Sequence, residues 1–303
     1  MRFEYPYLAA LAAVVREGSF EAAARSLNIT QSAVSQRIKH LEEKSGAVLI
    51  IRGRPCMATE YGQQLCHHVE QVRLLEHDLK ENLGSMDAPE GGAPAVIRIA
   101  VNSDSLATWF PEVILRAGAE LNLNFDVIPD DQEHTADRLR NGEALAAITT
   151  ESRPLHGCQR IPLGAMEYQA VATPDFIKQH LSDGVTADTV SQACSLIFNR
   201  KDLLPQKWLL DAFGESVPLQ GHLLPTFTGY LQCLLNGSGW GMMPSSTLRP
   251  YLKNRSLQEL KPGTRVWVPL HWQAGTGSSE IMRVLSNMVL SVARRTLQQT
   301  PDL

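Results

Sequence analysis

Apolar residues recur with a helical period in three short segments at the start of the chain. The positions that share an inner face in the first two segments are Leu8, Leu11, Val14, Val15, Ala23, Ala24 and Leu27. Val34, Ile38 and Leu41 do the same in the third segment. This spacing places each set on one side of a helix and predicts three packed helices.

Polar residues between these segments mark the helix ends. Gly18 ends the first helix, and Ser19 is placed to cap the second. Asn28 tolerates the left-handed conformation of a tight turn, and Thr30 can cap the third helix. Phe20–Gly46 is therefore predicted to form a helix, a tight turn and a second helix.

The outer face of the third helix carries short polar side chains. Ser32, Gln36 and Lys39 lie about 140–200° around the helix from Val34. Gln31 and Ser35 flank them at the N-terminal end. A solvated polar face is the simpler explanation of such a pattern. In a helix-turn-helix context we instead predict that these five residues read base edges in DNA.

A short apolar strand follows, and then Arg52-Gly53-Arg54-Pro55. The chain returns to Thr59, which predicts a β-wing with two arginines at its tip. Arg52 and Arg54 are placed to contact the DNA backbone or a narrow minor groove.

A long helix is predicted from about Glu60 to Leu83. Its apolar stripe consists of Leu65, Val69, Val72, Leu75, Leu79 and Leu83. No neighbouring helix in sequence covers this stripe, which favours pairing with a second copy of the chain. Packing of the stripe onto its own domain is the alternative.

Gly84–Pro94 is rich in glycine, proline and small residues and has no periodicity, which predicts a hinge. Beyond it, strands and helices alternate, as in an α/β domain with parallel sheets. A polar turn, Asn102–Ser105, follows the first strand, and Pro111 is expected to divide the helix after it. The remaining strands are predicted at 124–128, 145–148, 169–173, 195–198, 223–226, 240–243 and 265–272.

Composition and charge fit this division. Residues 1–60 carry 8 Lys/Arg and 6 Asp/Glu, whereas the remainder carries 20 and 26. A slightly basic N-terminus on an acidic body is the asymmetry expected of a DNA-binding protein.

No signal peptide or run of about 18 apolar residues is evident. The five cysteines have no pattern. We therefore expect no membrane partner and a cytoplasmic, nucleoid-associated location.

The stretch FEAAARSLNITQSAVSQRIKHLEEKSG, the wing, the long helix and the α/β region resemble a LysR-type transcriptional regulator over essentially the whole length. ITQSAVSQRIKHLE, VNSDSLATW, DRLRNGE and LHWQ are similar to the arginine/lysine-responsive ArgP/LysG/IciA subgroup. The resemblance implies a winged helix-turn-helix, mainly α, and an α/β effector domain of two subdomains like a type 2 periplasmic binding protein.

The resemblance also implies domain boundaries. We predict a DNA-binding domain over 1–60, a dimerisation helix over 61–84 and a hinge over 85–95. Residues 96–165 and 268–303 would form the first effector subdomain, and residues 166–267 the second. The expected partners are operator DNA, a small-molecule effector (lysine or arginine), further copies of the chain in a dimer or tetramer, and RNA polymerase. No metal or other cofactor is expected.

An amino-acid effector requires donors for its carboxylate and acceptors for its ammonium group. Polar residues just past the strand ends, where open α/β sheets bind ligands, are candidates. The predicted effector residues are Ser103, Asp104, Ser105, Asp130, Asp131, Thr149, Thr150, Phe198 and Thr226. Several of them could instead cap helices. Arg200 and Lys201 add positive charge nearby, which would suit a neutral or acidic effector.

Other functional classes are less well supported. GSGWGMMP has spaced glycines but lacks the rest of a dinucleotide fingerprint, and no hydrolase, zinc-protease or Walker motif is present. An enzyme is therefore not expected. A solute-binding protein would not need the first 85 residues. A nucleoid-type architectural DNA binder remains the alternative to an effector-controlled regulator of amino-acid transport or metabolism genes.

Overall fold

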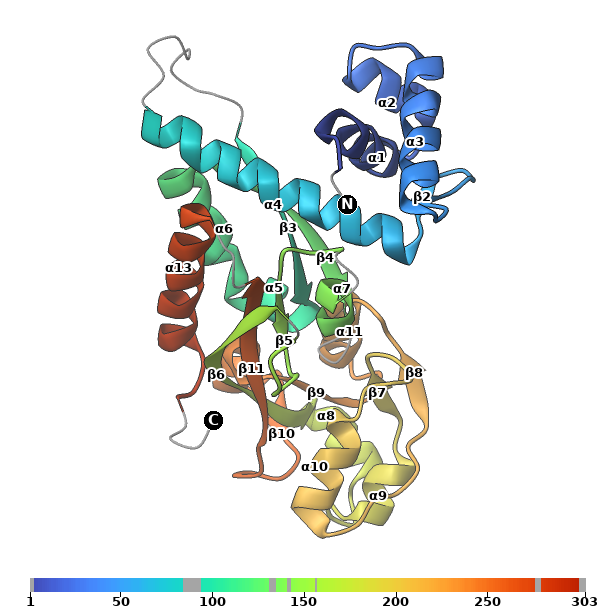
Figure 1. Ribbon diagram of the computed structural model, residues 1–303. Coiled ribbons are helices and arrows are strands. Elements are labelled where there is room, and N and C mark those ends of the chain that lie inside the picture. Colours follow the sequence, from blue (N-terminus) through green and yellow to red (C-terminus); the bar gives the residue numbers. More distant parts are fainter. Residues whose placement is uncertain are drawn as a thin grey trace.

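The three N-terminal helices form where the apolar spacing places them. A computed structural model describes residues 3–83, 94–130, 135–140, 143–155, 157–275 and 279–299. Its first helices are α1 Tyr5–Glu17, α2 Phe20–Ser26 and α3 Gln31–Ser45 (Figure 1). The Ser19 hydroxyl accepts the Ala22 amide at 3.1 Å, and the Thr30 hydroxyl accepts the Ala33 amide at 3.2 Å. Both predicted N-caps are confirmed.

The wing is a short hairpin held against the turn between α1 and α2. Strands β1 (Ile50–Ile51) and β2 (Met57–Ala58) pair antiparallel, as predicted. The Cys56 amide donates to the Gly18 carbonyl at 2.7 Å. Gly18 has φ 70°, and a Cβ there would lie 3.0 Å from the Pro55 Cβ. The absence of a side chain at Gly18 therefore permits both the left-handed turn and the close approach of the wing.

Helix α4 (Glu60–Leu83) connects the N-terminal domain to the rest of the molecule (Figure 1). Thr59 caps it by accepting the Gly62 amide at 3.1 Å. Part of its apolar stripe is buried within the chain and part is exposed. The prediction that the whole stripe pairs with a second copy is therefore wrong. Leu65 and Val69 are buried in the core of their own N-terminal domain. Leu75 and Leu79 are 50% and 57% exposed and remain available to a partner.

A second face of α4 contacts the α/β region. Leu74 is buried in the main core of that region. One turn further along, Asp78 accepts the backbone amides of Glu280 and Ile281 at 2.7 and 3.3 Å. These amides open α13, so Asp78 satisfies donors that the helix itself leaves unpaired. The face that carries Leu74 and Asp78 is thus fixed to the α/β region.

The α/β region contains a nine-stranded sheet in the order β4-β3-β5-β11-β6-β9-β7-β8, with β10 paired to β6. Its elements in chain order are β3 Ala95–Asn102, α5 Ser103–Thr108, α6 Phe110–Leu121, β4 Leu123–Asp130, α7 Thr135–Arg140, β5 Ala146–Thr149, β6 Cys158–Ala172, α8 Pro174–His180, α9 Ala187–Gln192, β7 Ser195–Ile197, α10 Leu204–Phe213, β8 Gly221–Leu223, α11 Phe227–Leu235, β9 Trp240–Pro244, α12 Ser245–Lys253, β10 Gln258–Glu259, β11 Val266–Gly275 and α13 Glu280–Thr296.

The sheet is mixed, which corrects the prediction of parallel sheets. Strands β3–β5 form one parallel group, and β7–β9 form another. Between them, β6 and β11 pair antiparallel over Tyr168↔Val266 to Cys158↔Gly275, with a register shift at Leu270/His271. The two long strands join the groups into one sheet, because β11 pairs with β5 of the first group and β6 pairs with β9 of the second.

Three element boundaries differ from the predictions. The expected turn at Ser103–Ser105 is the first turn of α5, whereas the expected division of the helix near Pro111 is confirmed, since α6 begins at Phe110. Strand β6 begins at Cys158 rather than near Gln169, and β8 ends at Leu223. The β8 shift has a local cause, because Thr226 caps α11 by accepting the Gly229 amide at 3.3 Å.

Candidate functional site

The outer face of α3 is accessible as predicted. Gln31, Ser32, Gln36 and Lys39 are exposed, and Ser35 is half-buried. The Ser32 hydroxyl is 2.9 Å from that of Thr30, and the Lys39 ammonium is 3.8 Å from Glu43. Val34, Ile38 and Leu41 hold the opposite face in the domain core. The helix therefore presents short hydrogen-bonding groups on a rigid support, which is the arrangement that base reading requires.

The two wing arginines have different surroundings. The Arg52 guanidinium lies over the Phe20 ring, with its carbon 5.3 Å from the ring centroid. This contact ties the wing to the start of α2. Arg54 is exposed at the tip and, within the described part of the chain, has no ion-pair partner. The tip thus offers one guanidinium already packed on protein and another open to a phosphate.

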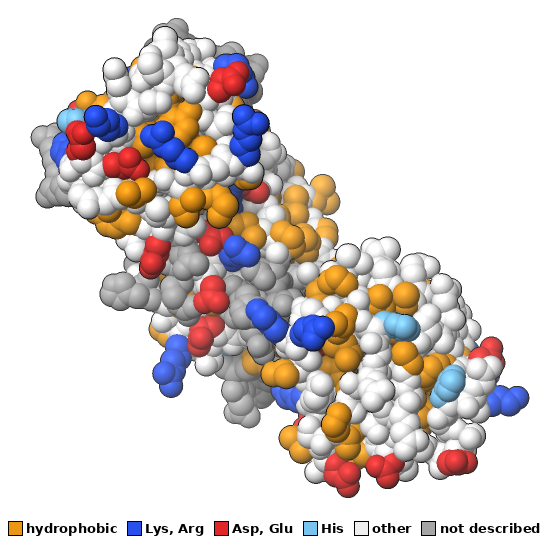
Figure 2. All heavy atoms as spheres, turned by 90° about the vertical axis from the view of Figure 1, so that its right-hand side faces the viewer, with side chains coloured by type: hydrophobic (Ala, Val, Ile, Leu, Met, Phe, Trp, Pro, Cys, Tyr) orange, Lys and Arg blue, Asp and Glu red, His pale blue; other side chains and the backbone are white. Residues whose placement is uncertain are grey.

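Basic side chains on the N-terminal domain are dispersed. In the upper part of Figure 2, the Lys and Arg side chains lie among hydrophobic, polar and a few acidic side chains. The pairs Arg25–Glu21 and Lys44–Glu4 neutralise part of the charge. Electrostatic attraction to a polyanion is therefore modest for a single copy.

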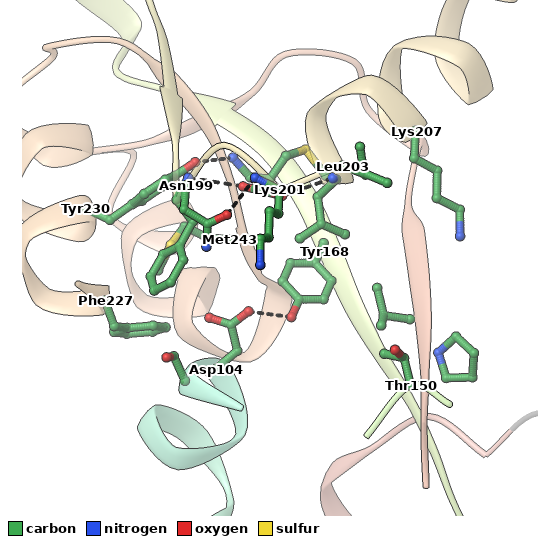
Figure 3. Close-up of a pocket in the computed structure, with 17 residues that line it drawn as sticks. Asp104, Thr150, Tyr168, Asn199, Lys201, Leu203, Lys207, Phe227, Tyr230 and Met243 are labelled. Atoms are coloured by element: carbon green, nitrogen blue, oxygen red, sulfur yellow. Dashed lines mark hydrogen bonds between the residues drawn. The ribbon is translucent and has the colours of Figure 1, made fainter. Parts of the chain in front are cut away.

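A pocket of about 320 Å³ lies between the two parallel groups of strands (Figure 3). Ser103, Asp104 and Thr150 come from the first group, and Tyr168, Val268 and Pro269 come from the crossing strands. Its other lining residues, all from the second group, are Phe198, Asn199, Lys201, Asp202, Leu203, Leu204, Lys207, Phe227, Tyr230, Met242 and Met243. This is an apolar and aromatic chamber with a few charged groups, as small-molecule sites usually are.

Asp104 is the acidic group on the first side of the pocket. The Tyr168 hydroxyl donates to its Oδ2 atom at 2.5 Å (Figure 3). A phenol that donates to a carboxylate holds its orientation and favours its charged form. The pocket therefore contains an oriented negative charge beside an aromatic ring.

The loop from Phe198 to Leu204 forms the opposite wall. Asp202 accepts the amides of Phe198 and Leu204 at 3.1 and 3.0 Å, and Asn199 accepts the Lys201 amide at 2.8 Å. Figure 3 shows the Lys201 side chain directed into the pocket. The Lys207 ammonium donates to the Trp267 carbonyl at 3.3 Å. This wall therefore brings both signs of charge to the chamber.

Tyr230 stabilises the wall formed by the second parallel group through two buried hydrogen bonds. Its hydroxyl donates to the Leu196 carbonyl at 2.7 Å and accepts the Met242 amide at 2.9 Å. Burial, followed by the nearby Asp202, raises the pKa of Tyr230 well above its usual value, so the phenol stays neutral. A Cβ at Gly241 would lie 2.3 Å from the Tyr230 hydroxyl, so only glycine fits there.

Four of the predicted effector residues line the pocket, namely Ser103, Asp104, Thr150 and Phe198. Ser105 does not, because its buried hydroxyl accepts the Trp109 indole N–H at 3.1 Å. Thr149 is also buried and accepts the Glu151 amide at 3.0 Å, while Thr226 caps α11 outside the lining. These three predicted residues therefore lie outside the pocket lining, and local hydrogen bonds engage their hydroxyls.

The two remaining acidic predictions have a different status. Asp130 ends β4, where its backbone pairs with that of Asn102. Asp131 lies outside the described residues. Of the two cations noted in sequence, Lys201 lines the pocket, whereas exposed Arg200 does not.

Sequence reasoning missed most of the aromatic and apolar lining. Tyr168, Phe227 and Tyr230 have the pattern of ordinary core residues, and no local signal separates a pocket wall from a core. Asp202 carried a usable signal, since an acidic residue shortly before a helix often caps it. Its approach to Asp104 depends on how the two halves pack.

A second cavity of about 480 Å³ lies where α1, α4 and the β3–β4 edge meet. Arg73 pairs with Glu70 at 2.7 Å, and Arg98 pairs with Asp126 at 2.5 Å, so these four charged groups in its wall are paired. His67 of α4 also lines it, and burial lowers the pKa of that imidazole.

Among the described residues no helix has the length and apolarity to cross a membrane.

Comparison with known proteins agrees with this two-part organisation. Residues 7–63 match the family described as bacterial regulatory helix-turn-helix protein, lysR family. Residues 90–294 match the LysR substrate binding domain. The chain is 39% identical over 288 residues to the HTH-type transcriptional regulator ArgP of Pseudomonas fluorescens (strain Pf0-1), covering 95% of this chain and 96% of that protein.

It is also 42% identical over 288 residues to the HTH-type transcriptional regulator LysG of Mycobacterium tuberculosis (strain H37Rv), covering 95% and 93% of the two chains. Among solved structures, ArgP from M. tuberculosis superposes with a TM-score of 0.85 at 39% identity, covering 99% of this chain and 100% of that one. Full-length LysG from Corynebacterium glutamicum with bound effector Arg gives 0.74 at 32% identity, covering 98% and 100%. This chain therefore belongs to the LysR family of DNA-binding transcriptional regulators.

Proposed function

We propose that the effector of this regulator is a basic amino acid, lysine or arginine, and that it binds in the pocket between the two parallel groups. The observation that carries the proposal is the Asp104 carboxylate, oriented by Tyr168 inside an aromatic chamber. A buried carboxylate attracts an ammonium or guanidinium group, and a charge-assisted hydrogen bond contributes about 1.5–3 kcal/mol. The C. glutamicum LysG structure with bound Arg supports the same class.

The charges of the pocket suit a zwitterion with an extra cation. Asp104 and Asp202 lie on opposite walls, and Lys201 is directed between them. Lys201 can pair with the effector carboxylate, while the two acids face its cationic groups. The aromatic rings of Tyr168 and Phe227 provide surfaces for a guanidinium or an aliphatic stem.

A neutral or acidic amino acid is the second candidate. The observation in its favour is that Lys201 and Lys207 both line the pocket. Lys207 is already engaged with the Trp267 carbonyl, which weakens this alternative.

On the DNA side, we propose that Gln31, Ser32, Ser35, Gln36 and Lys39 contact bases or backbone and that the wing arginines contact the backbone. Two or more copies would be paired through the exposed Leu75 and Leu79 face of α4. Effector binding would change the relative orientation of the halves, and with it the spacing between recognition helices. Genes for amino-acid transport or metabolism are the proposed targets, and RNA polymerase is a proposed partner in the bacterial cytoplasm. The chain is assigned no catalytic reaction.

We also propose the domain boundaries given by the sequence. These are 1–60, 61–84, a hinge over 85–95, 96–165 with 268–303, and 166–267. Their support is that β6 and β11 cross between the two parallel groups near residues 165 and 268. Residues 85–93 of the hinge lie outside the described part of the chain.

Thermal-shift measurement on the full-length protein with each of the twenty amino acids tests the effector class. We expect L-lysine or L-arginine to raise the melting temperature and L-glutamate and L-leucine to leave it unchanged. Isothermal titration of the positive compounds would give their dissociation constants. A clear shift with a neutral or acidic amino acid, and none with the two basic ones, would overturn the assignment.

A further inference from the structure

Gln273 of β11 makes three hydrogen bonds to one loop. Its Oε1 accepts the Leu155 amide at 2.8 Å. Its Nε2 donates to the carbonyls of Glu151 and Arg153 at 3.2 and 3.0 Å. The side chain has 0% exposure, so water does not compete for these bonds.

The loop that Gln273 contacts connects β5 to β6 and begins beside the effector pocket. Thr150, its first residue, lines the pocket. The Thr149 hydroxyl accepts the Glu151 amide at 3.0 Å, and the Glu151 side chain accepts the Arg153 amide at 3.1 Å. At the far end, the Leu155 side chain is buried in a small apolar cluster with Ala147. Gln273 therefore adds three hydrogen bonds along a segment that also has contacts of its own at both ends.

The chemistry of this position requires an amide. Two loop carbonyls need donors and one loop amide needs an acceptor, and a primary amide provides both types of group. Glutamate of the same shape would accept the amide but, as a carboxylate, would face two carbonyl oxygens without a proton to donate. Loss of the side-chain amide would leave the buried Leu155 N–H without its acceptor and would remove the donor to two loop carbonyls, which costs free energy.

We propose that Gln273 is a positioning residue for effector recognition: it holds the 150–155 loop so that Thr150 and its backbone face the bound molecule. Gln273 does not line the pocket and acts only through the loop. The inference rests on the proposed effector site, but the loop contacts can be tested without any effector.

The first measurement is amide hydrogen exchange on the full-length protein without effector. In Gln273→Ala we expect the Leu155 amide to exchange at least about tenfold faster, because its acceptor is gone. Ser286→Ala is the matched control. Ser286 accepts the indole N–H of Trp272, the neighbour of Gln273 on β11, at 2.9 Å. That variant loses a comparable interior hydrogen bond and should leave exchange at Leu155 unchanged.

The second measurement is isothermal titration with L-arginine and with L-lysine. We expect Gln273→Ala and Gln273→Glu to weaken binding by about tenfold or more, and Ser286→Ala to retain wild-type affinity. Operator affinity without effector should be the same in all variants, since the N-terminal domain is untouched. Binding to Gln273→Glu should improve as the pH falls, because a neutral carboxyl group can donate to one loop carbonyl.

The outcomes separate the two proposals. Faster exchange at Leu155 with selective loss of effector affinity supports the role of Gln273. Unchanged exchange at Leu155, unchanged effector affinity in a folded Gln273 variant, or an equal loss in Ser286→Ala overturns it. If the wild-type protein binds neither basic amino acid, the effector class is wrong, and the exchange data still decide whether Gln273 holds the loop.

Discussion

The Tyr168 hydroxyl donates a 2.5 Å hydrogen bond to the Asp104 carboxylate, from β6 to α5. The two residues are 64 positions apart in sequence and meet inside the pocket. Asp104 opens a helix directly after the first strand of the sheet, whereas Tyr168 lies on a strand that crosses between the halves. This pair therefore connects the first parallel group to a crossing strand inside the pocket.

Replacing Asp104 tests the acceptor for the effector cation. Asp104→Asn keeps the side-chain size but removes the charge, so the dissociation constant for L-arginine should rise by about tenfold or more. Isothermal titration gives this value directly. Asp126→Asn is a suitable control. Asp126 forms a 2.5 Å ion pair with Arg98 and does not line this pocket. Equal arginine affinity in the wild type and Asp104→Asn would exclude Asp104 from the cation site.

The face of α3 should determine which DNA sequence is bound. Gln36→Ala and Ser35→Ala are each expected to lower operator affinity by about 1–3 kcal/mol, since they remove hydrogen-bond partners of base edges. Fluorescence anisotropy on operator and scrambled duplexes checks this. The loss should be confined to the operator, and the dependence on salt should change little. If both variants retain wild-type operator affinity, α3 is not the recognition helix.

The two wing arginines should differ in their effect on salt dependence. Arg54 is open at the tip, so Arg54→Ala should reduce the slope of log affinity against log salt by about one. Arg52 packs on Phe20, so Arg52→Ala should weaken binding with a smaller change in slope. Titrations at several salt concentrations distinguish the two. Identical slopes for both variants would show that the packing difference has no functional consequence.

The exposed part of α4 should hold copies of the chain together. Leu75→Arg combined with Leu79→Arg places charge on the two exposed leucines in the described part of α4 and should convert the assembly to monomers. Light scattering after size exclusion measures the mass. Leu210→Arg changes a leucine of similar exposure, 54%, on α10 and should leave the mass unchanged. Unaltered mass in the double variant would place the interface elsewhere.

Burial of His67 should make stability depend on pH. Burial, with a smaller effect of His68, lowers the pKa of the imidazole in the folded state. The unfolded chain then binds the proton more tightly, so the free energy of unfolding is unaffected above about pH 6.5 and falls as the pH drops below it. Urea denaturation from pH 8 to pH 5 should show this loss, and His67→Asn should reduce it. Equal pH dependence in the variant would assign the effect to other groups.

Much of the N-terminal domain could be predicted from the sequence because its determinants are local. Ser19 and Thr30 cap helices whose first amides lie three residues away, and Gly18 adopts the left-handed turn that ends α1. The inner face of α3 depends only on the helical period of Val34, Ile38 and Leu41. Local hydrogen bonding and periodicity do not require knowledge of the rest of the chain.

The lining of the pocket proposed to bind the effector was only partly predictable for the opposite reason. Ser103, Asp104, Thr150 and Phe198 follow strand ends, where open α/β sheets bind ligands, and all four line the pocket. Ser105, Thr149 and Thr226 also lie at or after strand ends but do not line the pocket, and nearby N–H groups donate to their hydroxyls. The spacing of apolar residues along the sequence did not show that Tyr168 and Tyr230 would line the pocket.

The sequence by itself therefore determined the winged helix-turn-helix, the long connecting helix and the family to which the chain belongs, since short-range patterns specify these features. The tertiary structure decided which face of α4 is covered, that β6 and β11 make the sheet mixed, and which polar groups remain for a ligand. These depend on contacts between distant residues, such as Asp78 with the start of α13 and Tyr168 with Asp104. Such contacts form only when the separate elements pack, so no local pattern encodes them.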